Sequence, residues 1–245
     1  MWAKLPGLTG DEVVTKARAA GVSRLVCVGC DLQDSQLAID FAKDRAGCWA
    51  AVGIHPHEAK LHLDSEKLSR FAALSTAPKV VAIGECGLDY YYDHSPKAAQ
   101  LKVLEFQLEL AQAANLPVIF HVREAFDDFW PTFDNYQGVR GVLHSYTDSA
   151  ANLEKALARG LYLGVNGIAT FAKDQAQLAV YQAIPLDRLL LETDAPFLTP
   201  APYRGKINEP KRLRAVAEFV AKLRGEAVED LAAATTTNAR QIFGI

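Results

Sequence analysis

The sequence has little of several features that mark whole classes of proteins. Its four cysteines fit a reducing compartment better than a disulfide framework. No apolar run approaches the roughly 20 residues that span a bilayer, and residues 1–10 lack the apolar core of a signal peptide. The net charge of −3 excludes a large basic face that holds nucleic acid. We therefore expect a cytoplasmic protein without a membrane partner.

The residues that are present indicate a folded α/β-type chain. Half of the 245 residues are hydrophobic and 22% are charged, so disorder is excluded. Because barrels of alternating strands and helices commonly reach about 250 residues, we expect a single domain over residues 1–245. Cys27 and Cys30 form a C-x-x-C pair, but no second pair follows. We interpret both as small residues buried on a strand and its exit loop.

Seven short apolar runs recur along the chain at regular intervals. They are continuous rather than alternating, as expected for parallel strands covered on both faces. Helix signals separate them: Thr9 and Glu12 form a capping box, and Asp34 and Ser95 are predicted helix starts. This alternation predicts a parallel α/β architecture. The predicted strands are 24–29, 48–53, 80–84, 117–121, 139–144, 161–165 and 188–192.

A closed barrel and an open doubly wound sheet both fit this alternation. No G-x-G-x-x-G or G-x-x-x-x-G-K-[ST] segment follows a strand, so the usual phosphate loop of nucleotide folds is missing. Polar residues lie at or just after the ends of several predicted strands, and in a barrel those ends converge on one face. We therefore predict a TIM (β/α)8-type barrel whose first strand is missing or replaced, since only seven strands are found. The polar residues are His55, Glu85, His121, His144 and Asp194.

Four of these strand-end residues suggest a metal site. Two imidazoles and two carboxylates make a mixed site suited to Zn²⁺, Mn²⁺, Fe²⁺ or Ni²⁺ and less suited to Mg²⁺. Taken singly, a histidine at a strand end is more often a hydrogen-bonded structural residue, and an aspartate before Ala-Pro is usually a turn residue. Their placement together on one rim favours a metal site. The four are Glu85, His121, His144 and Asp194.

Seven segments occur in order over nearly the whole chain, from about Val13 to the C-terminus. They are residues 53–57 (GIHPH), 84–90 (GECGLDY), 121–124 (HVRE), 144–145 (HS), 192–198 (ETDAPFL), 204–210 (RGKINEP) and 237–240 (TNAR). Together they resemble the TatD family of metal-dependent deoxyribonucleases. The resemblance implies an amidohydrolase-like TIM barrel and hydrolysis of DNA phosphodiester bonds with one or two divalent ions, Mg²⁺, Mn²⁺ or Zn²⁺.

The resemblance also implies a role for each predicted ligand. Glu85 is the carboxylate that bridges two metals, and His121 and His144 complete the shell of one of them. Asp194 binds the other metal and orients or deprotonates the attacking water. Glu85 and Asp194 are therefore the predicted catalytic residues.

Further residues are candidates for contacts with the substrate. Arg123 and Arg204 are cations suited to a phosphate, and His55 and His57 are predicted to line the cleft. Aromatic residues follow the predicted ligand strands, where ordinary packing of the barrel-top loops is the favoured interpretation and stacking on the bases of a single strand is the alternative. These aromatic residues are Tyr90, Tyr91, Tyr92 and Phe197.

The N-terminal part of the sequence departs from the family pattern. Family members begin with a strand that ends in a His-x-His pair, whereas this sequence has no histidine before His55. Three explanations are open: a truncated start, a naturally reduced member, or a strand supplied by another chain. We expect one occupied metal site, a weak or empty second site, and reduced activity.

The main prediction is a metal-dependent deoxyribonuclease that acts exonucleolytically on single-stranded DNA or a strand end. One alternative keeps the fold and metal but changes the substrate to a small ester, an amide or an aminoacyl-tRNA. The other is a catalytically silent scaffold that binds nucleic acid or a partner. The identity of the metal, the choice between DNA and RNA, the direction of cleavage and the oligomeric state are left open by the sequence.

Overall fold

The computed structural model describes residues 9–92 and 94–245 of the chain. Internal contacts divide these residues into two compact units, which we describe separately. The Glu85 unit comprises residues 26–144 and 242–245, and the Asp194 unit comprises residues 9–25 and 145–241. That residues 1–245 form one domain stays a prediction.

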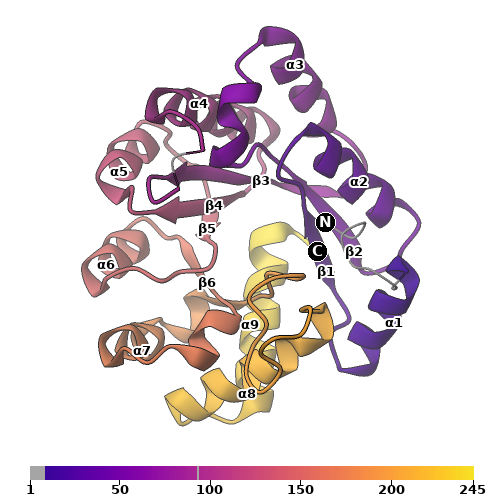
Figure 1. Cartoon of the computed structure of the whole chain (residues 1–245), viewed down its shortest axis with the longest axis vertical. Helices are drawn as coiled ribbons and strands as arrows, with labels where there is room; N and C mark the ends of the chain where they lie inside the picture. Colours follow the sequence, from indigo (N-terminus) through magenta and orange to yellow (C-terminus); the bar gives the residue numbers. More distant parts are fainter. Residues whose placement is uncertain (1–8, 93) are drawn as a thin grey trace. The chain divides into compact units, whose positions relative to one another are not determined.

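Five parallel strands alternate with helices along the Glu85 unit, and these strands neighbour one another in chain order (Figure 1). Gly87 on β3 pairs with His121 on β4, and Val118 on β4 pairs with Gly141 on β5. The elements are β1 (Leu25–Val28), α2 (Leu32–Lys43), β2 (Cys48–Val52), η2 (Pro56–Leu61), α3 (Ser65–Leu74), β3 (Val80–Asp89), α4 (Lys97–Ala114), β4 (Val118–Arg123), α5 (Phe126–Asp134) and β5 (Gly141–Leu143).

The apolar core of the Glu85 unit fixes the segment that follows β2. Ile54 is fully buried in a cluster with Phe71 of α3 and Val103 of α4. The side-chain amide of Gln107 lies in this core, where it accepts from Ile54 N (2.7 Å) and donates to Ile54 O (3.1 Å). Because these backbone groups would otherwise be buried without partners, Gln107 anchors the chain directly before His55.

The Asp194 unit contains two parallel strands and most of the remaining helices. β6 pairs with β7 through Leu163 opposite Leu189. The side-chain amide of Asn238 on the last helix donates to the carbonyl oxygens of Leu186 (2.8 Å) and Leu189 (2.9 Å), which ties that helix to the start of β7. The elements are α1 (Gly10–Ala19), α6 (Ala150–Ala158), β6 (Tyr162–Val165), η3 (Gly167–Phe171), α7 (Gln175–Ala183), η4 (Leu186–Arg188), β7 (Leu189–Leu191), η5 (Pro210–Arg212), α8 (Leu213–Arg224) and α9 (Val228–Phe243).

The predicted α/β class is confirmed, with all seven predicted strands found among the described residues. Strand β3 is the main correction, because it extends to Asp89 and so contains Glu85 instead of ending before it. The side chain that caps α2 is Asp31 rather than Asp34. Pro96 rather than Ser95 precedes α4, since the Ser95 hydroxyl donates to His57 O (2.7 Å) instead of capping the helix. Residues 1–8 lie outside the described residues, so the missing or replaced first strand stays a prediction.

Two further expectations concern cysteines and membranes. Cys27 is buried on β1, as predicted, whereas Cys30 follows this strand and is only half-buried. All four cysteines are present as thiols rather than disulfides. Within the described part of the chain, the length and hydropathy of the helices match no membrane-spanning segment.

Candidate metal and catalytic site

Glu85 lies at a local irregularity of β3 that glycines make possible. The pairing register between β3 and β4 shifts between Ile83 and Cys86. A Cβ added at Gly87, whose φ is +148°, would lie 1.9 Å from His121 O. A Cβ at Gly53 would lie 2.3 Å from the carbonyl carbon of Gly84. Glycines at these positions therefore allow the close approach of the backbones around Glu85.

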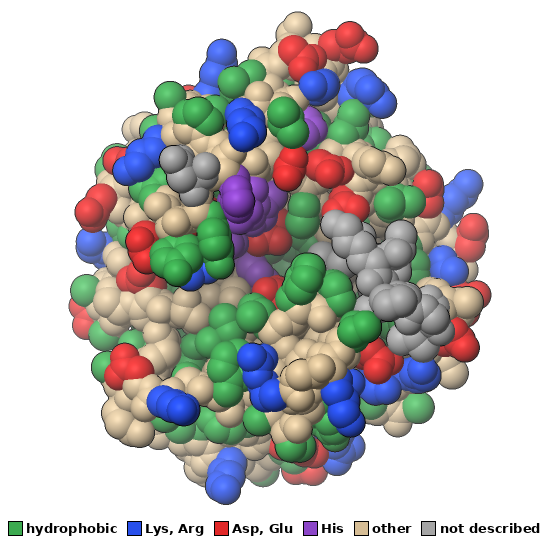
Figure 2. All heavy atoms as spheres, in the orientation of Figure 1, with side chains coloured by type: hydrophobic (Ala, Val, Ile, Leu, Met, Phe, Trp, Pro, Cys, Tyr) green, Lys and Arg blue, Asp and Glu red, His purple; other side chains and the backbone are tan. Residues whose placement is uncertain are grey.

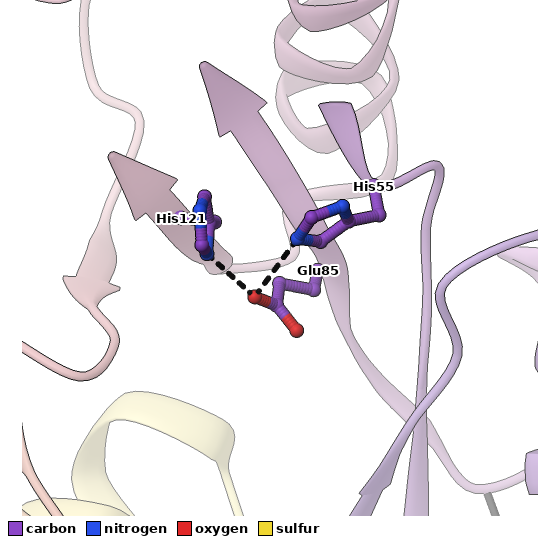
Figure 3. A group of neighbouring side chains, drawn as sticks. All are labelled: His55, Glu85 and His121. Carbon is purple, nitrogen blue, oxygen red and sulfur yellow. Dashed lines mark hydrogen bonds and ion pairs between the residues drawn. The ribbon is translucent and has the colours of Figure 1, made fainter. Parts of the chain in front are cut away.

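Three histidines surround the Glu85 carboxylate. Its Oε1 atom lies 3.0 Å from His121 Nδ1, 3.5 Å from His55 Nε2 and 3.8 Å from His144 Nε2. Figure 3 shows the rings of His55 and His121 approaching this oxygen from two sides. In Figure 2, histidine side chains gather in a hollow over the region of β3. The structure thus brings together the three ligands predicted in this unit.

Protonation in this cluster depends on the mutual contacts of its members. Burial would raise the pKa of Glu85, but the charge of His144 and the hydrogen bonds of His121 and His55 hold it well below its ordinary value. Burial would lower the pKa of His121, but hydrogen bonds to Asp89 and Glu85 raise it to about 9. Without a bound ion, these contacts favour the ionised form of Glu85 and the protonated form of His121.

Asp89 is a functional candidate that the sequence analysis missed. Its side chain is only 1% exposed, and its Oδ2 atom lies 2.9 Å from His121 Nε2 and 3.0 Å from His57 Nε2. Residues 85 and 89 are four positions apart on one strand, so their side chains share a face. That alternation is the signal that finds Asp89, and the prediction that β3 ends at Gly84 concealed it.

His121 therefore lies between two carboxylates, one at each ring nitrogen. A histidine that binds a metal through one nitrogen usually donates the proton on the other to a carboxylate or carbonyl. Asp89 is placed to accept that proton from Nε2, which leaves Nδ1 on the side of Glu85. This arrangement favours His121 as a ligand through Nδ1.

His55 differs from His121 in its tautomer. Its Nδ1 atom accepts a hydrogen bond from the backbone N–H of His57 (3.2 Å), so its proton is on Nε2, which faces Glu85. A ring that uses Nε2 as a ligand normally donates through Nδ1. The local turn at Pro56 therefore favours His55 as a proton donor to Glu85 rather than as a metal ligand.

The donor set fits a divalent ion. Single ligand atoms of His55, Glu85 and His121 all lie within 4.8 Å of one another. Imidazole nitrogen and carboxylate oxygen suit Zn²⁺ and Mn²⁺. Because the orientation of His55 favours proton donation, the fit is best for Glu85 with His121 and His144.

A cluster of aromatic and cationic side chains lies next to Asp89. The guanidinium of Arg123 lies over the rings of Tyr91 (3.8 Å to the centroid) and Tyr92 (4.9 Å). Tyr90 is held differently, because its hydroxyl donates to Asp128 (2.7 Å) and Lys97 lies over its ring. The predicted substrate residue Arg123 is thus located among exposed aromatic rings.

The other predicted site residues lie in the Asp194 unit. Asp194 is half-buried after β7, where its carbonyl accepts from Phe197 N (2.6 Å). Arg204 is exposed, donates to Thr199 O (2.9 Å) and lies over the ring of Phe171 (3.9 Å). The roles of Asp194 as a ligand and of Arg204 as a substrate contact stay predictions.

A separate hollow of about 810 Å³ lies along α2, η2 and α3. It lies apart from the proposed ligands, since none of Glu85, His121 and His144 lines it. The lining residues are Asp31, Leu32, Gln33, Gln36, Glu58, Leu61, His62, Lys67, Arg70, Ala73 and Leu74. A small-molecule substrate would need a small apolar pocket beside the ligands, and this hollow lies elsewhere.

Parallel strands that alternate with helices, together with a carboxylate surrounded by imidazoles, are typical of metal-dependent α/β hydrolases. Comparison with known proteins places the chain within this class. Residues 6–244 match the family model described as "TatD related DNase". The chain belongs to the TatD-related DNase family, which confirms the resemblance found in the sequence.

Individual relatives support this assignment over nearly the full length. The chain is 40% identical to the "Uncharacterized metal-dependent hydrolase YabD" of Bacillus subtilis (96% of this chain, 92% of that protein). It is 42% identical to the "3'-5' ssDNA/RNA exonuclease TatD" of Cronobacter turicensis (95% and 91%). The solved TatD homologue YJJV of Escherichia coli K12 has the same fold, with a TM-score of 0.91, 28% identity and coverage of 100% and 96%.

Proposed function

We propose that this chain hydrolyses phosphodiester bonds of nucleic acid, exonucleolytically and on single-stranded DNA, with a divalent metal ion. The observation that carries the proposal is the Glu85 carboxylate with His121 Nδ1 at 3.0 Å and His144 Nε2 at 3.8 Å. Support comes from the family and from relatives named as metal-dependent hydrolases and single-strand exonucleases.

Glu85, His121 and His144 would hold the ion. The chemistry that a bound divalent ion supplies is Lewis acidity, which activates water at neutral pH and offsets charge on the phosphate. Asp89 keeps the His121 ring oriented through its contact with Nε2. His55 holds a proton at Nε2 and donates it toward Glu85.

The remaining assignments are carried from the sequence as proposals. Arg123, a cation beside the tyrosines, contacts the phosphate backbone of the substrate. His57 lies next to this cluster and is held there by its contact with Asp89. The resemblance to the family supports two further roles, Asp194 as a metal ligand and Arg204 as a substrate contact. It also supports a site for one or two ions. A cytoplasmic location is supported by the four cysteine thiols.

The test is a cleavage assay on end-labelled single-stranded DNA, duplex DNA and RNA with Mn²⁺, Mg²⁺ or Zn²⁺. We expect a ladder that shortens from one end of the single strand and that disappears with chelator. The Glu85→Gln variant should lose this activity, whereas Glu105→Gln, which changes an exposed carboxylate on α4, should keep it. Binding without cleavage under all three metals would favour a silent scaffold instead, and metal-dependent cleavage of a small ester alone would favour the other hydrolase reading.

A further inference from the structure

Two large aromatic side chains are exposed immediately beside the proposed metal ligands. Tyr91 is 52% exposed and Tyr92 is 42% exposed, whereas the neighbouring Asp89 is 1% exposed. Exposed aromatic rings close to a polar site are features of ligand recognition more than of packing. Tyr91 and Tyr92 therefore offer flat apolar surfaces to a ligand that binds at this site.

The backbone that carries the two tyrosines is held in place by the buried carboxylate of Asp89. Its Oδ1 atom accepts from Tyr91 N (3.0 Å) and Tyr92 N (2.9 Å). Gln100 in turn fixes the backbone of Asp89, accepting from its N–H (2.8 Å) and donating to its carbonyl oxygen (3.0 Å). A turn with this many fixed groups loses little entropy when a ligand binds, so the rings form a pre-organised surface.

Asp89 also joins this turn to the proposed metal site. While Oδ1 holds the tyrosine backbone, Oδ2 lies 2.9 Å from His121 Nε2. The ring of Tyr92 lies 5.5 Å from that of His57, which shares the same Oδ2 atom. One carboxylate therefore sets the distance between the aromatic rings and the ligand His121.

The chemistry around the rings indicates what binds there. The guanidinium of Arg123 lies 3.8 Å from the centroid of Tyr91 and offers a positive charge and a second planar surface. The rings of Tyr91 and Tyr92 are perpendicular, with centroids 4.7 Å apart. A base can stack on aromatic or guanidinium planes while the cation attracts the adjoining phosphate.

We propose that Tyr91, Tyr92 and Arg123 form a stacking subsite for the terminal base of a single-stranded nucleic acid, next to the phosphate that is cleaved. The proposal rests on the proposed function for the identity of the substrate. It names the feature that selects unpaired ends, because a base within a duplex has no free face for the rings. We expect binding at this subsite to depend little on which base is present, because every base has a stacking face.

The test compares oligonucleotides whose 3′-terminal nucleotide carries a base or is abasic, in wild type, in the double variant Tyr91→Leu/Tyr92→Leu and in Tyr136→Leu as a tyrosine control elsewhere in the unit. Loss of stacking reduces binding by about tenfold. Wild type and Tyr136→Leu should therefore lose about tenfold in kcat/KM on the abasic substrate. The double variant should lose about tenfold on the normal substrate and less than about twofold more on the abasic one. Tyr91→Phe/Tyr92→Phe should restore the wild-type pattern.

Fluorescence anisotropy with the same oligonucleotides, without metal, tests the subsite independently of cleavage. Preference for the terminal base in wild type and its loss in the leucine variant support the proposal. Equal preference in both proteins overturns it, even if cleavage proceeds normally. Absence of cleavage with an intact, tyrosine-dependent base preference instead contradicts only the proposed function.

Discussion

In the Glu85 unit, polar side chains from separate strands contact one another, whereas in the Asp194 unit the polar residues of the family segments mainly contact the backbone. Glu85, Asp89 and His121 form a chain of side-chain contacts at 2.9–3.0 Å. By contrast, the buried Asn208 donates to Phe197 O (2.8 Å), and Asn238 donates to two carbonyl oxygens near β7.

This difference shows that two kinds of requirement produce family segments that look alike in the sequence. Burying a carboxylate among imidazoles destabilises the fold unless the charges are paired, so a cluster of this kind indicates a role in binding or catalysis. A buried asparagine that satisfies backbone carbonyls stabilises a loop whether or not chemistry occurs there. The contrast therefore predicts loss of activity from changes in one unit and loss of stability from changes in the other.

The largest effect is expected from Glu85→Gln, which removes the charge that three histidines face. Activity on single-stranded DNA should fall by at least about 100-fold, because a metal contributes several kcal/mol of stabilisation to the transition state. A metal-dependent nuclease assay measures this, with circular dichroism to confirm folding. Retention of wild-type activity by a folded variant would remove Glu85 from the site.

Asp89→Asn should have the next largest effect. Asparagine can still accept from the Tyr91 and Tyr92 backbone N–H groups through its oxygen, but its NH₂ group cannot accept from His121 Nε2. Metal affinity should fall about 10- to 100-fold, as for other partners of ligating histidines. Titration of Mn²⁺ measures the affinity, with Asp127→Asn on the exposed start of α5 as the control. Equal affinity in both variants would contradict the positioning role.

Asn238→Ala should affect stability rather than chemistry. The change leaves the carbonyl oxygens of Leu186 and Leu189 without this donor. We expect a loss of about 1–3 kcal/mol in the free energy of unfolding, measured with urea. kcat at a temperature where the protein is folded should change by less than about twofold. The exposed Asn135→Ala provides the control, and a large fall in kcat with unchanged stability would erase the contrast between the units.

The smallest effect is expected from replacing Cys27 and Cys30 by alanine. The group of close potential ligands among the described residues consists of His55, Glu85 and His121 and includes neither thiol. Bound metal, measured by elemental mass spectrometry, should be unchanged, and activity should change by less than about twofold. Loss of metal from this variant would show that the C-x-x-C pair takes part in binding.

The sequence predicted the alternation of elements well because continuous apolar runs directly reflect burial on both faces of a strand. It also predicted that Glu85, His121 and His144 lie together, because each lies near the end of such a run, and their side chains are close in the structure. Asp89 was missed because Gly84 and Gly87 look like the end of a strand, although here they serve close backbone approach. Contacts between side chains on different strands cannot be predicted from the local sequence pattern of either strand.

The most direct test of the central claim is calorimetric titration of Mn²⁺ into the wild-type chain and into Glu85→Gln. The contacts of Glu85 with His121 and His144 predict that the wild-type protein binds at least one ion and that the variant loses this binding while Glu105→Gln retains it. Equal binding by the wild type and Glu85→Gln, both folded, would contradict the account.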